Sequence, residues 1–97
     1  MRPLRFEWDE AKNTANHRKH GVTFEQARTV FCDPRALFMA DPDHSDREDR
    51  FVLLGLSAEL QTLVVCHCFR GRDVIRIISA RKATRRERET YNRRWAR

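Results

Sequence analysis

Residues 50–80 read RFVLLGLSAELQTLVVCHCFRGRDVIRIISA and decide the fold class. They contain three runs of branched and aromatic residues, at 50–57, 60–69 and 73–80, which are typical of β-strands. The segments between the runs are short, and short connections join antiparallel neighbours. The stretch therefore predicts a three-stranded antiparallel meander.

The turn between the second and third strands sets which side chains share a face of the sheet. A two-residue turn at 71–72, with glycine first as type II′ turns prefer, would place His67 opposite Arg76. An even-length turn before the middle strand would add Arg50 to the same face. Because a one-residue change in loop length moves a side chain to the other face, this expected cluster of Arg50, His67 and Arg76 depends on the register.

The opposite face of the meander is expected to pack against helices, since it would carry mainly apolar side chains. Its members would be Phe51, Leu53, Val64, Cys66, Cys68, Ile75, Ile77 and Ser79.

Two helices are expected before the meander. Asp9 suits the N-cap of a polar helix over 9–20, and Gly21 suits the left-handed position that ends it. Thr23 and Gln26 have the spacing of a capping box for a second helix.

Short strands are expected on either side of these helices. Residues 4–8 predict an edge strand, and Pro34 ends the second helix before a strand over 36–40. Residues 41–49, DPDHSDRED, then read as a solvated loop. A calcium-loop interpretation is rejected because the sixth position lacks glycine and the twelfth is Val52 instead of glutamate.

The positive charge of the chain is concentrated after the meander. The chain has 20 Lys and Arg against 14 Asp and Glu, a net charge of +6, and the same excess is found in residues 81–97 alone, because eight basic and two acidic residues lie there. Thr84 and Glu87 predict the capping box of a helix in this segment. Such a localised positive field is typical of a surface that meets phosphate, and the alternatives are a solvated helix or one that docks an acidic protein.

Length and composition indicate one soluble, cytoplasmic domain of α+β class. The 97 residues leave room for one modest core, and no apolar run has the length of a membrane span or a signal peptide. The three cysteines are expected to be reduced. Zinc is set aside because His67 would point away from the neighbouring Cys66 and Cys68, and no second ligand pair follows.

The expected cluster suits RNA cleavage without a metal or other cofactor. A ribose 2′-hydroxyl that attacks the adjacent phosphate needs a base, cations for the developing charge and an acid for the leaving oxygen. His67 could act as base or acid, Arg76 and Arg81 could hold phosphate oxygens, and Lys82 could add a charge. Tyr91 could stack on a base or donate a proton.

Structural roles stay open for the same residues. His67 could be a buried strand residue with no catalytic role. Tyr91 and Trp95, four residues apart, could anchor the basic helix to the sheet.

The chain resembles the BrnT family of bacterial type II toxins in three segments. These are FEWDEAKNTANHRKHGVTFEQARTVF near the start, DPDHSDREDRFVLLGLS in the middle and RIISARKATRRERETY near the end. The resemblance implies a RelE-like fold with an antiparallel sheet, two N-terminal helices on one face and a basic C-terminal helix. It also implies a ribonuclease that inhibits translation and growth and is neutralised by a cognate antitoxin of ribbon-helix-helix type.

The resemblance carries further expectations about contacts. Promoter DNA would be bound only through the antitoxin, and the toxin could form a homodimer within that complex, with no membrane involved. By the resemblance, Lys19 and His20 are candidate RNA or antitoxin contacts. Apart from the resemblance, Arg50 in the expected cluster and Arg85 and Arg86 in the basic helix are candidate RNA contacts. The positions that match the last motif are Arg76, Ser79, Arg81, Lys82, Glu87 and Tyr91.

A second class of function competes with the ribonuclease. The chain could be a non-catalytic module that binds nucleic acid or an acidic partner through its terminal helix. Both hypotheses predict salt-sensitive RNA binding, and only the first predicts cleavage.

Overall fold

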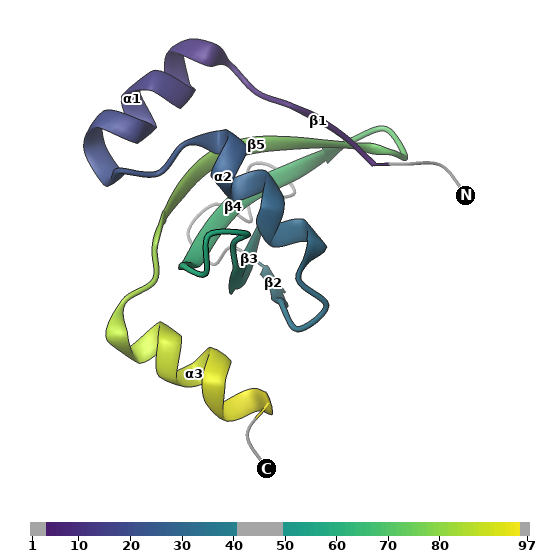
Figure 1. Ribbon diagram of the computed structural model, residues 1–97. Helices are drawn as coiled ribbons and strands as arrows, with labels where there is room; N and C mark the ends of the chain where they lie inside the picture. The colour runs from purple at the N-terminus through teal and green to yellow at the C-terminus, as the bar shows by residue number, and fades with distance from the viewer. Residues whose placement is uncertain (1–3, 41–49, 96–97) are drawn as a thin grey trace.

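The computed structural model describes residues 4–40 and 50–95, in which five strands form one sheet between helices (Figure 1). The strand order in the sheet is β1-β5-β4-β3-β2. The strands are β1 (Arg5–Glu7), β2 (Leu37–Ala40), β3 (Arg50–Leu56), β4 (Thr62–Arg70) and β5 (Val74–Lys82). The helices are α1 (Glu10–His20), α2 (Phe24–Thr29), the short 3₁₀ helix η1 (Val30–Cys32) and α3 (Arg85–Trp95). The expected α+β class is confirmed, and the loop over 41–49 lies outside the described residues.

The sheet is mixed, whereas an antiparallel sheet was predicted. Strands β2, β3, β4 and β5 pair antiparallel, but β1 lies parallel to β5 at the sheet edge. The long connection from β1 through the helices and three strands allows this arrangement, because parallel neighbours need a crossover instead of a tight turn. The first and last strands of the chain are therefore side by side.

The helix boundaries follow the predicted capping residues. The Asp9 carboxylate accepts hydrogen bonds from the amides of Ala11 and Lys12, and Gly21 ends α1 with a φ of 72°. Both halves of the capping box between Thr23 and Gln26 are present at α2. Local sequence therefore fixes where these helices begin and end.

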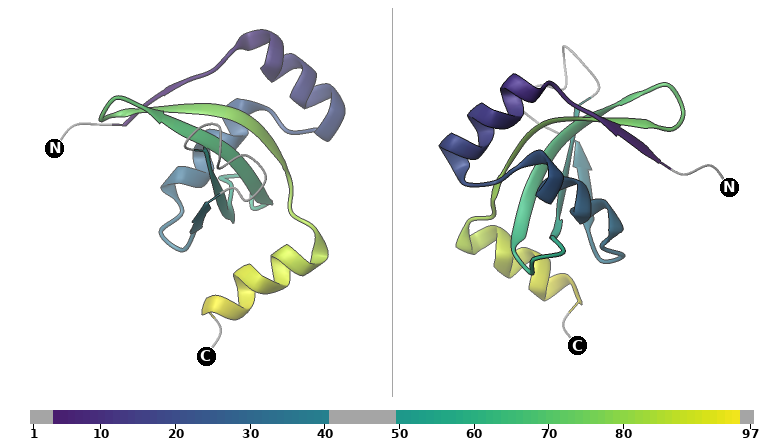
Figure 2. Two further views of the ribbon diagram at one scale, coloured as in Figure 1. Left: turned by 180° about the vertical axis from the view of Figure 1, so that it is seen from behind. Right: turned by 45° about the horizontal axis from the view of Figure 1, so that its top comes forward.

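Helices cover both faces of the sheet. The α1/α2 face packs against α1, α2 and η1, and the α3 face packs against α3 at one end of the sheet (Figures 1 and 2). The α1/α2 face is built from Phe51, Leu53, Leu63, Val65, His67, Ile75, Ile77 and Ala80. The α3 face is built from Arg50, Val52, Leu54, Val64, Cys66, Cys68, Arg76, Ser79 and Arg81.

Two buried asparagines attach the polar helix α1 to its neighbours. The Asn16 amide donates to the carbonyl oxygens of Val22 and Ala80, both at 2.8 Å, and its oxygen accepts from the Ala80 amide at 3.1 Å. The Asn13 oxygen accepts from the Phe24 amide at 2.8 Å. Side-chain amides thus replace the apolar stripe that α1 lacks.

The register differs from the predicted one at both turns and within β5. Residues 57–61 join β3 to β4, and the turn over 71–73 has three residues instead of two, with Gly71 at a φ of 72°. A β-bulge follows, because Cys66 pairs with Ser79 while His67 pairs with Ile77, which leaves Ile78 as the extra residue. The expected packing face is consequently wrong: Phe51, Leu53, Ile75 and Ile77 lie on the α1/α2 face, and Val64, Cys66, Cys68 and Ser79 lie on the other.

Candidate nucleic-acid interface

The predicted cluster of Arg50, His67 and Arg76 is wrong, because the sheet separates the histidine from both arginines. His67 pairs with Phe51 and Ile77, whereas Arg50 and Arg76 both pair with Cys68. Residues adjacent in a strand point to opposite faces, so the two arginines lie on the α3 face and His67 on the α1/α2 face. The odd loop lengths produce this separation.

His67 lies fully buried in an aromatic cluster. The centroid of its ring lies 4.9 Å from that of Phe31 and 5.5 Å from that of Phe69, with Phe38 and Phe51 also in contact. Its Nδ1 is 3.3 Å from the Val65 carbonyl oxygen, and Nε2 has no hydrogen-bond partner within the described part of the chain. Burial lowers the pKa of His67 below its ordinary value of 6.5. This geometry favours the structural role for His67.

The α3 face brings three arginines of the predicted site together. Arg50 on β3 and Arg76 on β5 flank Cys68 in one row across the sheet, so their backbones are about 10 Å apart at ordinary strand spacing. Arg81 pairs with Val64 and also points to this face. Five positions separate Arg76 from Arg81, an odd number that would place them on opposite faces of a regular strand. The bulge at Ile78 therefore puts Arg76 and Arg81 on the same face of the sheet.

Arg76 is held by a carboxylate from the first strand. Its Nη1 lies 2.9 Å from Oε2 of Glu7, and Nε of Arg70 lies 3.5 Å from the same oxygen. Glu7 reaches this position because β1 pairs with β5 and Glu7 lies opposite Arg76. The α3 face thus carries a cluster of one carboxylate and two guanidiniums, which we call the Glu7 cluster (Glu7, Arg70 and Arg76).

Arg81 forms a two-pronged ion pair with Glu87. Its Nη1 and Nη2 donate to the two carboxylate oxygens at 2.8 and 2.9 Å, and Glu87 also accepts from the Thr84 amide as the predicted capping box of α3. The hydrogen bonds from Arg81 lower the pKa of Glu87 to about 2 despite partial burial, and the same contact raises the pKa of Arg81. The contact links the end of β5 to the first turn of α3, in the bidentate geometry by which a guanidinium binds oxyanions.

The other predicted basic contacts are distributed around this face. Lys82 pairs with Leu63 and so points away from Arg81, towards the α1/α2 side. Lys19 is exposed and His20 half-buried at the end of α1, whose Asn16 contacts β5 at Ala80. Arg85 and Arg86 are exposed in the first turn of α3, where Arg85 lies 3.3 Å from Glu89. The structure therefore groups Arg50, Arg76 and Arg81, and leaves Lys82 on the other side of the sheet.

Tyr91 anchors α3 to the body of the protein. It is buried among Leu54, Val64 and Ala83, and its hydroxyl donates to Oδ2 of Asp33 at 2.6 Å. Burial and the contact with Asp33 raise the pKa of Tyr91 to about 12. These contacts support the packing role that was considered for Tyr91, whereas the side chain of Trp95 lies outside the described ones.

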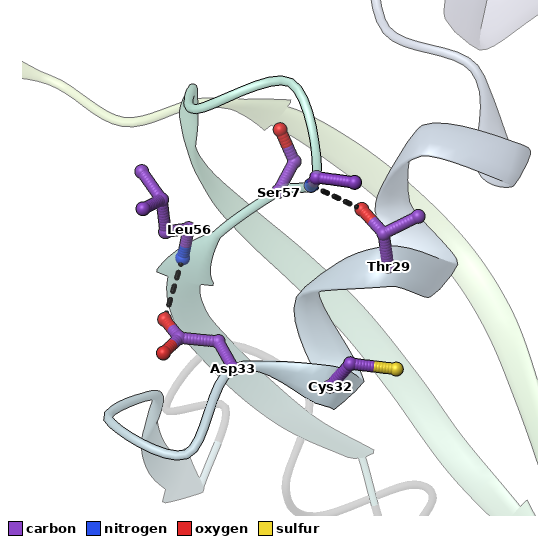
Figure 3. Close-up of a pocket in the computed structure, with 6 residues that line it drawn as sticks. Thr29, Cys32, Asp33, Leu56 and Ser57 are labelled. Atoms are coloured by element: carbon purple, nitrogen blue, oxygen red, sulfur yellow. Dashed lines mark hydrogen bonds between the residues drawn. The ribbon is translucent and has the colours of Figure 1, made fainter.

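Asp33 also belongs to the wall of a shallow pocket of about 240 Å³ between η1 and the β3–β4 connection (Figure 3). Burial raises the pKa of Asp33, but hydrogen bonds from Tyr91 and from the Leu56 amide outweigh it and hold the pKa below the ordinary value. Thr29 accepts from the Ala58 amide across the same wall. These polar groups bind one another, so the hydrogen bonds around the pocket connect α3, η1 and β3.

Replacing Tyr91 by phenylalanine should lower the free energy of unfolding by about 1.5 kcal/mol, because it removes a hydrogen bond to a charged acceptor and keeps the packing. Urea denaturation measures the change. Asp33→Asn provides the matched background, in which Tyr91→Phe should lower the free energy of unfolding by clearly less. An equal loss of unfolding free energy in both backgrounds would show that the hydrogen bond between Tyr91 and Asp33 does not stabilise the protein.

Sequence reasoning missed Glu7. It stands in the three-residue strand β1, and no local pattern indicates that this strand pairs with β5, which lies more than sixty residues further along the chain. The signal that was available is its position two residues before the predicted helix cap Asp9, in the first segment of the resemblance.

Comparisons with known proteins identify the family. The model of a family described as "Ribonuclease toxin, BrnT, of type II toxin-antitoxin system" matches residues 8–87. The protein is therefore of the class of type II ribonuclease toxins. The chain belongs to the BrnT family, as the sequence resemblance indicated.

A solved structure has a similar fold. The 1.1 Å crystal structure of the Brucella abortus ribonuclease toxin BrnT is similar with a TM-score of 0.67 and 24% sequence identity, and the match covers 84% of this chain and 99% of that one. At this identity the likeness shows the fold. Among the curated proteins no significant match is found. No helix in the described ranges is long and apolar enough to cross a membrane.

Proposed function

We propose that this chain is an endoribonuclease that cleaves RNA without a metal ion and thereby inhibits translation and growth in the cytoplasm. Membership of a ribonuclease toxin family supports the activity, and the α3 face supports its location. The observation that carries the location is that Arg50, Arg76 and Arg81, from two strands far apart in sequence, share this face.

The chemistry follows from the guanidiniums. In-line attack of a 2′-hydroxyl on the next phosphate builds negative charge on the non-bridging oxygens, and arginines placed in advance stabilise that charge. Arg76 donates to one oxygen of Glu7 at 2.9 Å, and Arg81 donates to both oxygens of Glu87 at 2.8 and 2.9 Å, so both guanidiniums already bind an oxyanion. A phosphate of the RNA would take up or share these donors.

The remaining basic residues would hold RNA around this centre. Arg85 and Arg86 on α3, with Lys19 and His20 at the end of α1, are proposed to contact the backbone phosphates on either side. Because each such contact releases counterions, RNA affinity should fall steeply as salt is raised. His67 and Tyr91 are not assigned to the reaction, since both are buried.

An Arg76→Ala variant should cleave single-stranded RNA at least about 10²-fold more slowly than the wild type, because it loses a donor to the transition state. The assay uses purified protein in EDTA and detects 2′,3′-cyclic phosphate ends. Arg72→Ala is the matched control, since Arg72 is exposed in the β4–β5 turn, outside the proposed site, and its loss should leave cleavage unchanged. RNA that stays intact with the wild type would favour a non-catalytic binding module.

Neutralisation by a cognate antitoxin of ribbon-helix-helix type is part of the proposal. The inhibitor is expected to cover the basic α3 face, because it must block the phosphate-binding groups, and to connect the toxin to promoter DNA. A toxin homodimer within the complex is likewise proposed. Co-purification with the product of the adjacent gene, with loss of RNA cleavage, tests the partnership.

A further inference from the structure

We propose that Glu7 is the general base of the cleavage reaction, taking the proton of the attacking 2′-hydroxyl beside Arg76. This inference rests on the proposed function. It starts from the Glu7 cluster, in which one carboxylate oxygen contacts Arg76 and Arg70 at 2.9 and 3.5 Å. About 37% of the Glu7 side chain and 32% of the Arg76 side chain are exposed, so the pair is accessible from solvent.

The position of Glu7 follows from strand pairing. The register places Arg50, Cys68, Arg76 and Glu7 in one row across β3, β4, β5 and β1. A phosphate bound between Arg50 and Arg76 would therefore have Glu7 at the end of the same row. The 2′-hydroxyl is attached to the sugar next to that phosphate. A side chain on the neighbouring strand β1 is close enough to reach this hydroxyl.

Other carboxylates near this face are already committed. Both oxygens of Glu87 bind Arg81, one of them also binds the Thr84 amide, and its pKa of about 2 makes it a weak base. Asp33 accepts from Tyr91 and Leu56 at the far end of α3. In Glu7, by contrast, both ion-pair contacts fall on Oε2, and no bond to Oε1 is found in the described ranges. That second oxygen can accept a proton from a bound ribose.

A purely structural explanation is weaker. Ion pairs with this much exposure contribute little to stability, since water competes for both partners. The pair nevertheless orders two arginine side chains on the face that carries the predicted phosphate contacts. A carboxylate next to guanidiniums is the arrangement that combines proton removal with stabilisation of the developing phosphorane.

In the proposed step, the proton of the 2′-hydroxyl moves to Glu7 as the phosphodiester is cleaved. The 2′-oxygen loses its proton to Glu7 and forms a bond to phosphorus, while the bond from phosphorus to the 5′-oxygen breaks. The 5′-oxygen takes a proton from water, and Glu7 later releases its own to solvent. Arg76, and Arg70 beside it, stabilise the negative charge on the non-bridging oxygens throughout. The products are a 2′,3′-cyclic phosphate and a 5′-hydroxyl.

The test compares Glu7→Gln with the wild type. The amide keeps an oxygen for Arg76 but cannot take the proton, so the cleavage rate should fall at least about 10²-fold. Binding of 2′-O-methyl RNA, which cannot react, should stay unchanged. If Glu7 is the base, the wild type should cleave more slowly at acid pH, because the carboxylate becomes protonated, and this acid limb should be absent in Glu7→Gln. Arg70 and Arg76 contact Glu7, and Cys68 lies beside Arg76 in the row.

Two further variants separate chemistry from structure. Glu7→Asp keeps a carboxylate and should retain more activity than Glu7→Gln, with the acid limb preserved. Asp73→Asn removes a comparable carboxylate, whose partner Arg5 lies at 3.6 Å, and should cleave like the wild type. Thermal melts of all variants show whether folding changes.

The outcomes are distinct. Cleavage by Glu7→Gln at the wild-type rate and pH profile would overturn the role of Glu7 while leaving the ribonuclease proposal standing. Equal losses in Glu7→Gln and Glu7→Asp with equal drops in melting temperature would also overturn it, in favour of a structural role. A wild-type protein that leaves RNA intact would overturn both proposals.

Discussion

An Asn16→Ala variant should lose about 3 kcal/mol of unfolding free energy, because three hydrogen bonds to buried backbone groups disappear and those groups stay away from water. The groups are the carbonyl oxygens of Val22 and Ala80 and the Ala80 amide. Since α1 has few apolar contacts of its own, nothing else compensates. Urea denaturation at neutral pH gives the measurement.

Two further substitutions test this account of α1. Asn16→Asp should be at least as destabilising, because it would place a carboxylate oxygen against two carbonyl oxygens. Asn92→Ala removes the same kind of side chain from an exposed position on α3 and should change the unfolding free energy by less than about 0.5 kcal/mol. A loss below about 1 kcal/mol in Asn16→Ala would contradict the role assigned to the amide.

The protein should lose stability as the pH falls below 6.5, the ordinary pKa of histidine. Burial lowers the pKa of His67 in the folded state, so the unfolded chain binds the proton first. The contribution of neutral His67 to the free energy of unfolding is thus fully present above pH 6.5. It decreases at up to about 1.4 kcal/mol per pH unit below it, until the pH reaches the folded-state value.

His67→Leu should remove this dependence and leave stability at pH 7.5 unchanged or higher, because a buried nitrogen without a partner is replaced by an apolar group. The lowered pKa values of Asp33 and Glu87 act in a different window, since their contributions are lost only below about pH 4.5. His17→Gln, which removes an exposed histidine of α1, is the control for the loss of an imidazole. If the unfolding free energy of the wild type and of His67→Leu depended on pH in the same way, protonation of His67 would not explain the loss of stability.

Local features of the fold were predictable from the sequence. The caps at Asp9, Gly21 and Thr84 and the capping box at Thr23 depend on residues three or four positions apart, and the structure confirms them. Strand existence followed from composition in the same way. What sequence reasoning gave correctly is therefore what neighbouring residues decide.

The candidate site was only partly predictable, because it depends on register. Arg50, Arg76 and Arg81 were predicted as site residues, and the structure places them on one face. His67 was predicted beside Arg50 and Arg76 only because the turn was expected to be one residue shorter than it is. The pairing of β1 with β5, which introduces Glu7, and the bulge at Ile78 are set by contacts between distant segments. Such contacts leave no periodic signal in a single sequence.

The extra residue in β5, Ile78, decides which basic side chain shares a face of the sheet with Arg76. If β5 kept Ile78 but paired without the bulge, every residue after Ile78 would change sides, so that Lys82 would share a side with Arg76 and the Arg81 guanidinium would turn towards α1 and α2. On that face, the planar guanidinium of Arg81, which can donate to two oxygens at once, would be replaced by the compact ammonium of Lys82, although the composition of the chain would be the same. In this protein, spacing as well as residue type selects the cation beside Arg76.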